Sequence, residues 1–261
     1  MTAEDPLLAN LTQPEAQEAL RRGTAILVTG SVEQHGSHLP LGTDAFAAGT
    51  IARRVAARIG APVLPISPVG VAPYHLPWPG SLTLRPSTLI DLIVDVSEGL
   101  ASAGVERILV VNWHEGNSSA VRLAAEEVQR RFPVRVIVAE SHVITNSLFP
   151  DEMEFTHAGS METAAVLAHD PSLVHLERLE GGDAVEWGSD GHALFRRRDL
   201  YPVLRDFREV AGSGWYGSPG SVSEERAREI IDAVAGYIVD SLEDVWKELA
   251  NRLPPVGEDA E

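Results

Sequence analysis

Acidic and imidazole side chains gather just after the first buried run of the sequence. Glu33 and His35 are two residues apart in the stretch GSVEQHGSHLPLGTD, which ends in Asp44. In an extended segment alternate side chains point the same way, so Glu33 and His35 share one side. Two intervening glycines allow the backbone to turn Asp44 back toward them. We therefore expect these three side chains to converge.

Two later segments carry the same residue types. The apolar run RILVV is followed by NWHEGN, which supplies His114 and Glu115, and the segment HAGSMET supplies His157 and Glu162. In an open parallel sheet, ligands bind beyond the carboxyl ends of the strands. We therefore look for the site at the edge that follows AILVT and RILVV.

This set of residues favours metal-assisted hydrolysis. The chain contains no cysteine, so metal ligands must be imidazoles or carboxylates. Such a mixed set suits zinc first, with manganese or iron as alternatives, and a carboxylate such as Asp44 can bridge two ions about 3.5 to 4 Å apart. Metal coordination lowers the pKa of water to about 7, which yields a hydroxide nucleophile without an activated serine or cysteine.

The surrounding pattern indicates an α/β fold that can position these residues. Short β-rich runs at 25–29, 62–66, 107–111 and 134–139 alternate with helical patterns at 44–59, 87–103 and 117–131. This order predicts three layers, with a mostly parallel central sheet and helices on both faces. Further helices are expected at 159–169 and 223–249. The turn-rich stretch 69–86 is interpreted as a pocket wall, and 181–219 has no assignable pattern.

Composition limits the class of protein. With 261 residues, 44% hydrophobic and 23% charged, we expect one domain over residues 1–253 and an acidic flexible tail over 254–261. The net charge of −17 disfavours nucleic acid and anionic membranes. The basic cluster at 196–198 is interpreted as a solvated loop, with an anionic contact as the alternative. The acidic N-terminus and the lack of long apolar runs predict a cytoplasmic location.

Together the three motifs resemble those of the creatininase family, in the same order and with matching spacing. The resemblance extends from about residue 24 to about residue 170, and more weakly to the last helix. It implies a central parallel sheet, a centre with two divalent metal ions, amidohydrolase chemistry on small or cyclic amides, and a homo-oligomer that is frequently a hexamer.

The resemblance also implies roles for individual residues. One metal ion would be held by Glu33, Asp44 and His114, and the other by Asp44, His35 and Glu162. His157 would be the acid-base residue that protonates the departing nitrogen, with a simple helix-capping or orienting role as the alternative. A loop like the family's substrate loop would place His75, Trp78 and Ser81 near the substrate.

The chain departs from the family pattern at three positions of one motif. Creatininase itself places a metal-binding glutamate where this chain has Gly116, so Glu162 must take that role, which argues against creatinine as substrate. Trp113 and Glu115 replace small glycines, which suggests a differently shaped or more acidic pocket for a polar or cationic substrate. Glu115 is a candidate catalytic residue, with substrate contact, spare ligand and exposed acid left open.

Some of these candidate residues can also be interpreted as having a purely structural role. Trp78 and Trp113 are candidate substrate-binding residues, but tryptophan often packs in a core or an interface. His38 is expected to orient a ligand through a hydrogen bond rather than bind metal. Candidate small-molecule substrates are a lactam, a cyclic guanidine, a formamide or a modified peptide. The alternative function is a non-catalytic metal-binding oligomeric scaffold of the same fold.

Overall fold

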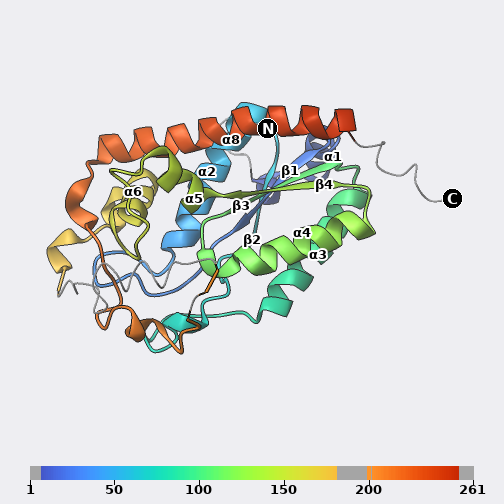
Figure 1. Cartoon of the computed structure of the whole chain (residues 1–261). Coiled ribbons are helices and arrows are strands. Elements are labelled where there is room, and N and C mark those ends of the chain that lie inside the picture. The colour runs from blue at the N-terminus through green and yellow to red at the C-terminus, as the bar shows by residue number, and fades with distance from the viewer. Residues whose placement is uncertain (1–6, 181–198, 201, 253–261) are drawn as a thin grey trace.

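The chain forms a four-stranded parallel sheet with helices on both of its faces (Figure 1). The computed structural model describes residues 7–180, 199–200 and 202–252. The strands are β1 (Thr24–Thr29), β2 (Val63–Ser67), β3 (Arg107–Asn112) and β4 (Arg135–Glu140), and they pair in the order β2-β1-β3-β4. The expected α/β class is confirmed.

Both faces of the central strands are buried. Ile26 and Val28 of β1 belong to one apolar cluster, while Ala25 and Leu27 belong to another on the opposite face. A strand covered on both faces needs apolar residues at every position rather than at alternate ones. This is why AILV in β1 and ILVV in β3 are uninterrupted apolar runs.

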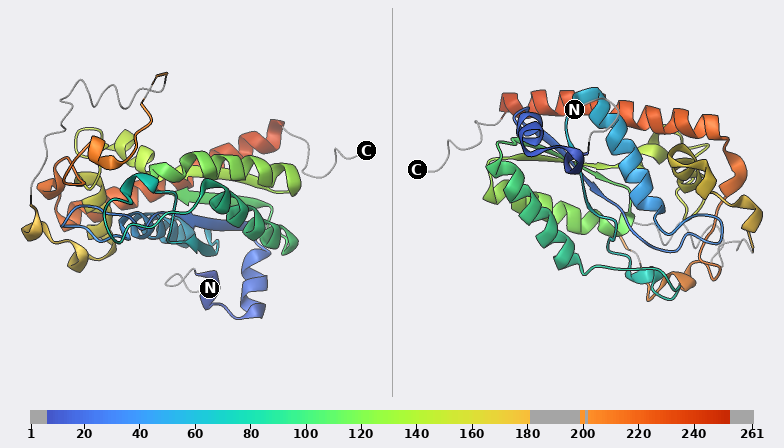
Figure 2. Two further views of the ribbon diagram at one scale, coloured as in Figure 1. Left: turned by 90° about the horizontal axis from the view of Figure 1, so that it is seen from below. Right: turned by 180° about the vertical axis from the view of Figure 1, so that it is seen from behind.

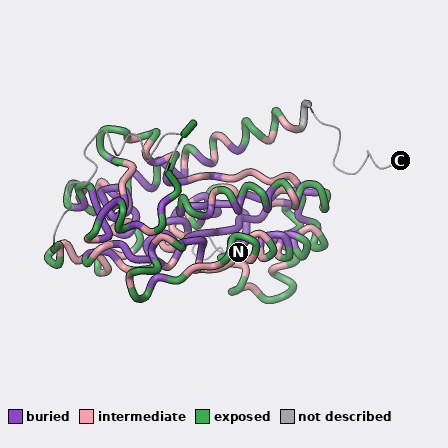
Figure 3. Tube along the Cα trace, turned by 60° about the horizontal axis from the view of Figure 1, so that its bottom comes forward, coloured by how far each residue is buried: buried purple, intermediate pink, exposed green. Residues whose placement is uncertain are grey.

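Two sets of helices supply the covering layers (Figure 2). On one face lie α2 (Thr43–Ile59), α6 (Ser160–His169) and α8 (Glu224–Arg252), which contact one another. On the other face lie α3 (Pro86–Ser102) and α4 (Ser118–Arg131), which pack together. In Figure 3 the buried stretches run through the centre of the molecule, and the outer helices alternate between buried and exposed residues.

The expected helices and strands are present with ends shifted by up to three residues. Pro86 opens α3, where its fixed φ favours the first helical turn. Among the α-helices of the described residues, two were not predicted. The first, α1 (Gln13–Leu20), begins at a capping box of Thr12 and Glu15. The second, α5 (Ser141–Leu148), contains three consecutive β-branched residues, which weaken its helical signal.

Several expectations fall outside the described residues. These are the acidic tail at 254–261 and the basic cluster at 196–198, together with much of the unassigned segment 181–219. Within the described ranges, no helix combines the length and the apolar character needed to cross a bilayer. The division into one domain and a tail remains a prediction.

Candidate metal centre and active site

The five expected metal ligands lie together at the carboxyl edge of the sheet. Glu33 and His35 stand in the loop after β1, Asp44 in the first turn of α2, His114 after β3, and Glu162 in the first turn of α6. Each of them is at most 8% exposed. The fold gathers residues that are up to 129 positions apart in the sequence, which is the separation between Glu33 and Glu162.

His35 presents one nitrogen to two carboxylates. Its Nδ1 donates to the carbonyl oxygen of Glu33 at 3.0 Å, so in the neutral ring the lone pair is on Nε2. This Nε2 lies 3.5 Å from Asp44 Oδ1 and 3.6 Å from Glu162 Oε2. It is buried and has no hydrogen-bond partner among the described residues. Donors about 2.1 Å from one tetrahedral zinc ion lie about 3.4 Å apart, so each of these carboxylate oxygens lies at a distance from Nε2 that is suitable for sharing a cation with it.

Asp44 occupies the middle of the cluster. Its Oδ1 faces His35, and its Oδ2 lies 3.0 Å from His114 Nδ1. The hydroxyl of Ser31 donates to the same Oδ2 at 2.5 Å. A carboxylate whose two oxygens face different imidazoles has the arrangement expected of a ligand between two ions.

His114 contacts two carboxylates through different nitrogens. Its Nε2 lies 3.0 Å from the carbonyl oxygen of Val71 and 3.3 Å from Glu33 Oε2. Because a carbonyl oxygen only accepts, Nε2 carries a hydrogen, and in the neutral ring that a metal ion would require, the lone pair is on Nδ1, facing Asp44. The described donor groups close enough to share an ion include Glu33, His35 and Asp44, and also His35, His157 and Glu162.

Burial and charge act strongly on these groups. Burial raises the pKa of Glu33 to about 7, although His114 opposes the shift. Burial alone would lower the pKa of His114, but the carboxylates of Glu33 and Asp44 outweigh it and raise the pKa to about 9. Three carboxylates buried in one place need compensating positive charge. Together with the orphaned atoms Glu33 Oε2 and His35 Nε2, this donor set fits divalent cations.

A strained turn holds Glu162 in place. Ala158 has a φ of 55°, a left-handed conformation that costs a non-glycine residue about 1 to 2 kcal/mol. In this conformation its N–H donates to Glu162 Oε2, and its carbonyl accepts from His38 Nε2 at 2.8 Å. His38 therefore supports the turn that carries Glu162, and its expected orienting role remains a prediction.

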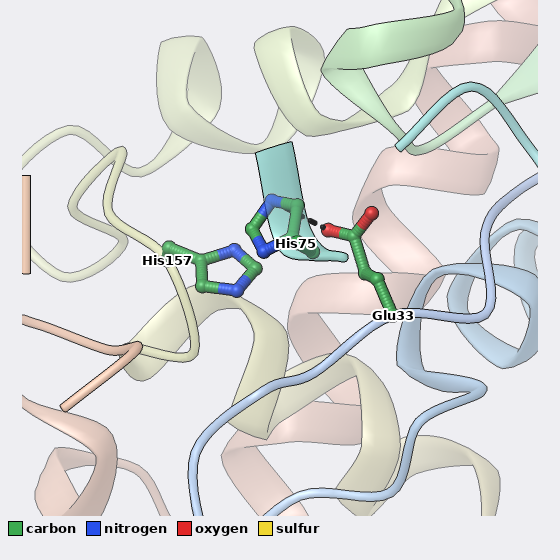
Figure 4. Close-up of side chains that lie close together, drawn as sticks. All are labelled: Glu33, His75 and His157. Atoms are coloured by element: carbon green, nitrogen blue, oxygen red, sulfur yellow. Dashed lines mark ion pairs between the residues drawn. The ribbon is translucent and has the colours of Figure 1, made fainter. Parts of the chain in front are cut away.

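Burial lowers the pKa of His157 to about 4, with His35 adding to the shift. Its ring lies 4.6 Å from the rings of both His35 and His75. Burial also lowers the pKa of His75, and the nearby ring of His157 lowers it further. Figure 4 shows His75 and His157 side by side next to Glu33, with His75 Nε2 at 3.4 Å from Glu33 Oε1.

The other expected substrate residues have different surroundings. The Ser81 hydroxyl is buried and accepts from the backbone N–H of Gln34 at 2.9 Å. Trp78 is half-buried. Trp113 is 1% exposed and belongs to the apolar cluster on the face covered by α2, α6 and α8, and Glu115 is exposed. The structure thus places Ser81 at the site and Trp113 in the core, while the roles of all four residues remain predictions.

Sequence reasoning missed three groups that shape this site. Gln34, between two expected ligands, bonds to the loop at Gly214. Phe207 packs against the rings of His75 and His157 at 4.8 and 4.7 Å, but it lies in the unassigned segment. Asn117 donates to the carbonyl of Gly30 and accepts from the N–H of Val71, which ties three loops together. Gln34 and Asn117 stood within quoted motifs, whereas Phe207 did not.

Comparison with known proteins gives related curated sequences. The chain is 26% identical to the 3-dehydro-scyllo-inosose hydrolase of Thermotoga maritima, over 94% of this chain and 85% of that protein. It is 26% identical to the creatinine amidohydrolase of Pseudomonas putida, over 90% and 95%. It is 30% identical to the mycofactocin precursor peptide peptidase of Mycobacterium tuberculosis, over 80% of each.

Solved structures and a family model agree with these relatives. A crystal structure of creatinine amidohydrolase (creatininase) superposes with a TM-score of 0.72 at 25% identity, covering 92% of this chain and 98% of the other. A structure described as creatininase Mn gives a TM-score of 0.73 at 23% identity, over 92% and 98%. The family model described as creatinine amidohydrolase matches residues 9–242. The chain therefore belongs to the creatininase family of amidohydrolases, as its three motifs predicted.

Proposed function

We propose that this protein is a metal-dependent amidohydrolase that hydrolyses a carbon-nitrogen bond of a small amide. The observation that carries the proposal is the buried cluster in which Asp44 lies between His35 and His114 with three carboxylates in total. Stability of the fold does not require three buried carboxylates in one place. Together with the imidazoles, these carboxylates provide the donor set of a hydrolytic metal site.

Five side chains would hold the metal. Glu33, Asp44 and His114 would bind one divalent ion, and Asp44, His35 and Glu162 the other. Zinc is the first candidate for imidazole and carboxylate donors, with manganese or iron as alternatives. Similar structures are described as creatininase Mn and as creatininase of the Zn-Zn type. When bound, such ions acidify a water molecule and polarise the carbonyl oxygen of an amide.

His157 would move the proton that the reaction requires. Its Nε2 donates to the carbonyl oxygen of Gln34 at 2.8 Å, which leaves the lone pair on Nδ1. Nδ1 lies 4.0 Å from Glu162 Oε2, on the side of the carboxylates. From this position Nδ1 can accept a proton as water attacks the carbonyl carbon and return it to the departing nitrogen.

Position 116 supports a substrate other than creatinine. A Cβ atom on Gly116 would lie 2.3 Å from the carbonyl oxygen of Val71 and 2.5 Å from His114 Nε2. The backbone here leaves no room for the glutamate that creatininase carries, which supports Glu162 as the ligand in its place. We propose a cyclic amide, a formamide or a modified peptide, and the exposed Glu115 favours a polar or cationic one.

The test combines metal analysis with a substrate panel. Purified protein is analysed for bound metal, stripped with EDTA, and reloaded with zinc or manganese. Each form is then assayed against lactams, cyclic guanidines including creatinine, formamides and short peptides. We expect activity that EDTA abolishes and metal restores. A fully loaded protein that is silent on the whole panel, or a stripped protein with undiminished turnover, would contradict the proposal.

Assembly and partners are separate expectations. The family predicts a homo-oligomer, frequently a hexamer, and the composition predicts a cytoplasmic protein that binds neither nucleic acid nor membranes. Light scattering coupled to size-exclusion chromatography tests the first expectation, and a filter-binding test at low salt tests for nucleic acid.

A further inference from the structure

The side-chain amide of Gln34 has a fixed orientation. Its Oε1 accepts from the backbone N–H of Gly36 at 3.1 Å, and its Nε2 donates to the backbone carbonyl of Gly214 at 2.7 Å. Because a backbone N–H can only donate and a carbonyl can only accept, the reversed amide would oppose like groups at both ends. The orientation of this amide therefore follows from its neighbours.

The backbone of Gly214 approaches this amide more closely than a residue with a side chain could. It has a φ of 85°, and a Cβ atom there would lie 2.4 Å from Gln34 Oε1. Gly214 and Gln34 are 180 positions apart in the sequence. The close approach of glycine backbone thus encloses the side chain of Gln34, which is 5% exposed.

The second hydrogen of the amide determines the tautomer of His75. Gln34 Nε2 gives one hydrogen to Gly214, and His75 Nδ1 lies 3.0 Å away, within reach of the other. His157 Nε2, at 3.1 Å, is not the acceptor because it donates its own hydrogen to the carbonyl oxygen of Gln34. An amide nitrogen has no lone pair to offer, so His75 Nδ1 must be the acceptor. The imidazole hydrogen therefore sits on Nε2, which faces Glu33 Oε1 at 3.4 Å (Figure 4).

The backbone of Gln34 determines the tautomer of His157. His157 Nε2 lies 2.8 Å from the carbonyl oxygen of Gln34 and 3.1 Å from its Nε2. The carbonyl can only accept, so Nε2 carries the hydrogen. The opposite tautomer would place a nitrogen lone pair against the carbonyl oxygen and would leave Nδ1 protonated beside Glu162.

We propose that Gln34 is a positioning residue that selects the Nε2–H tautomer of both His75 and His157. His75 then donates to Glu33 and holds that carboxylate, and it does not bind metal. The group formed by Glu33, His75 and His157, although its donor atoms lie within 4.8 Å of one another, is accordingly not a third metal site. His157 keeps Nδ1 free for proton transfer, and only this consequence rests on the proposed function.

The test is a spectroscopic measurement that needs no substrate. Protein with ¹⁵N-labelled histidine is loaded with zinc, and long-range ¹H–¹⁵N correlations are recorded for its nine histidines. His75→Gln and His157→Gln identify the two spin systems. We expect a protonated Nε2 and an unprotonated, downfield-shifted Nδ1 in both rings. A proton on Nδ1 of either ring would overturn the assignment, whether or not the protein proves to be an amidohydrolase.

A variant tests whether Gln34 makes the selection. Gln34→Glu keeps the shape of the side chain but replaces the Nε2 donor with an acceptor. At alkaline pH, where the new glutamate is ionised, we expect His75 to move its hydrogen to Nδ1. Gln17→Glu, on the exposed face of α1, is the matched control and should leave all shifts in place. If folded Gln34→Glu keeps the hydrogen of His75 on Nε2, the proposal that Gln34 selects the tautomer is refuted. If this variant does not fold, the wild-type spectrum still tests the two tautomers that the proposal requires.

Discussion

The hydroxyl of Ser31 offers a sharp test of the metal centre. Ser31 is fully buried and donates to Asp44 Oδ2 at 2.5 Å, but it touches no other expected ligand in the described contacts. Ser31→Ala leaves Asp44 itself unchanged but removes the hydroxyl that donates a hydrogen bond to its carboxylate. The change removes one oxygen atom and no charge.

The expected loss follows from the type of hydrogen bond. A hydrogen bond to a charged group contributes about 1.5 to 3 kcal/mol to stability. Removing a group that orients a metal ligand weakens metal binding by about 10- to 100-fold, which corresponds to about 1.4 to 2.7 kcal/mol. We therefore expect Ser31→Ala to bind zinc about 10- to 100-fold more weakly than the wild type.

Ser97 provides a matched control. It is equally buried, in α3, and its hydroxyl has no hydrogen-bond partner among the described residues. Ser97→Ala removes the same atom without breaking a bond, so it should leave zinc affinity unchanged and unfolding free energy equal or higher. Zinc affinity is measured by competition with a chelator, and stability by urea unfolding of the metal-free protein. Equal zinc affinity in the two variants would refute the reasoning about Asp44.

Substitutions at three further positions, two of them paired with a control, test the surroundings of the site. His157→Ala should keep full metal content and lose turnover, and a retained rate would reject its proton-transfer role. Gly116→Ala should weaken zinc binding by at least about 10-fold because its Cβ would meet Val71, whereas Gly99→Ala, with open space in α3, should stabilise the protein by about 0.5 to 1 kcal/mol. Ala158→Val, which strains a positive φ, should lower the unfolding free energy by about 1 to 3 kcal/mol and weaken zinc binding, while Ala158→Gly should bind zinc like the wild type. A Val variant as stable as the wild type would contradict the strain argument.

Much of the fold could be predicted because the strands are buried on both faces. Uninterrupted apolar runs such as ILVV at 108–111, alternating with amphipathic helices, point to a parallel sheet. The parallel order then gathers the loops after β1 and β3 at one edge, which is why Glu33 and His114 could be expected to meet. Local sequence was sufficient to predict this part of the site because the parallel topology brings the loops together.

The remaining parts depend on contacts that local sequence does not encode. The bond between Gln34 and Gly214 spans 180 residues and uses a backbone carbonyl, so no spacing rule reveals it. Phe207 lies in a segment without periodicity. In α5 the run Val143 to Thr145 favours a strand locally, and packing against neighbouring elements overrides this preference. Trp113 stood in a motif beside His114, yet its side chain points into the core because neighbours in an extended segment alternate.

The central claim is that Glu33, His35, Asp44, His114 and Glu162 hold divalent metal. X-ray diffraction from zinc-loaded crystals, recorded on both sides of the zinc absorption edge, locates such ions directly. We predict anomalous peaks about 2.0 to 2.2 Å from these side chains, with Asp44 contacting both ions. Zinc-loaded crystals without a peak at this cluster, or with peaks only on surface carboxylates, would contradict the account.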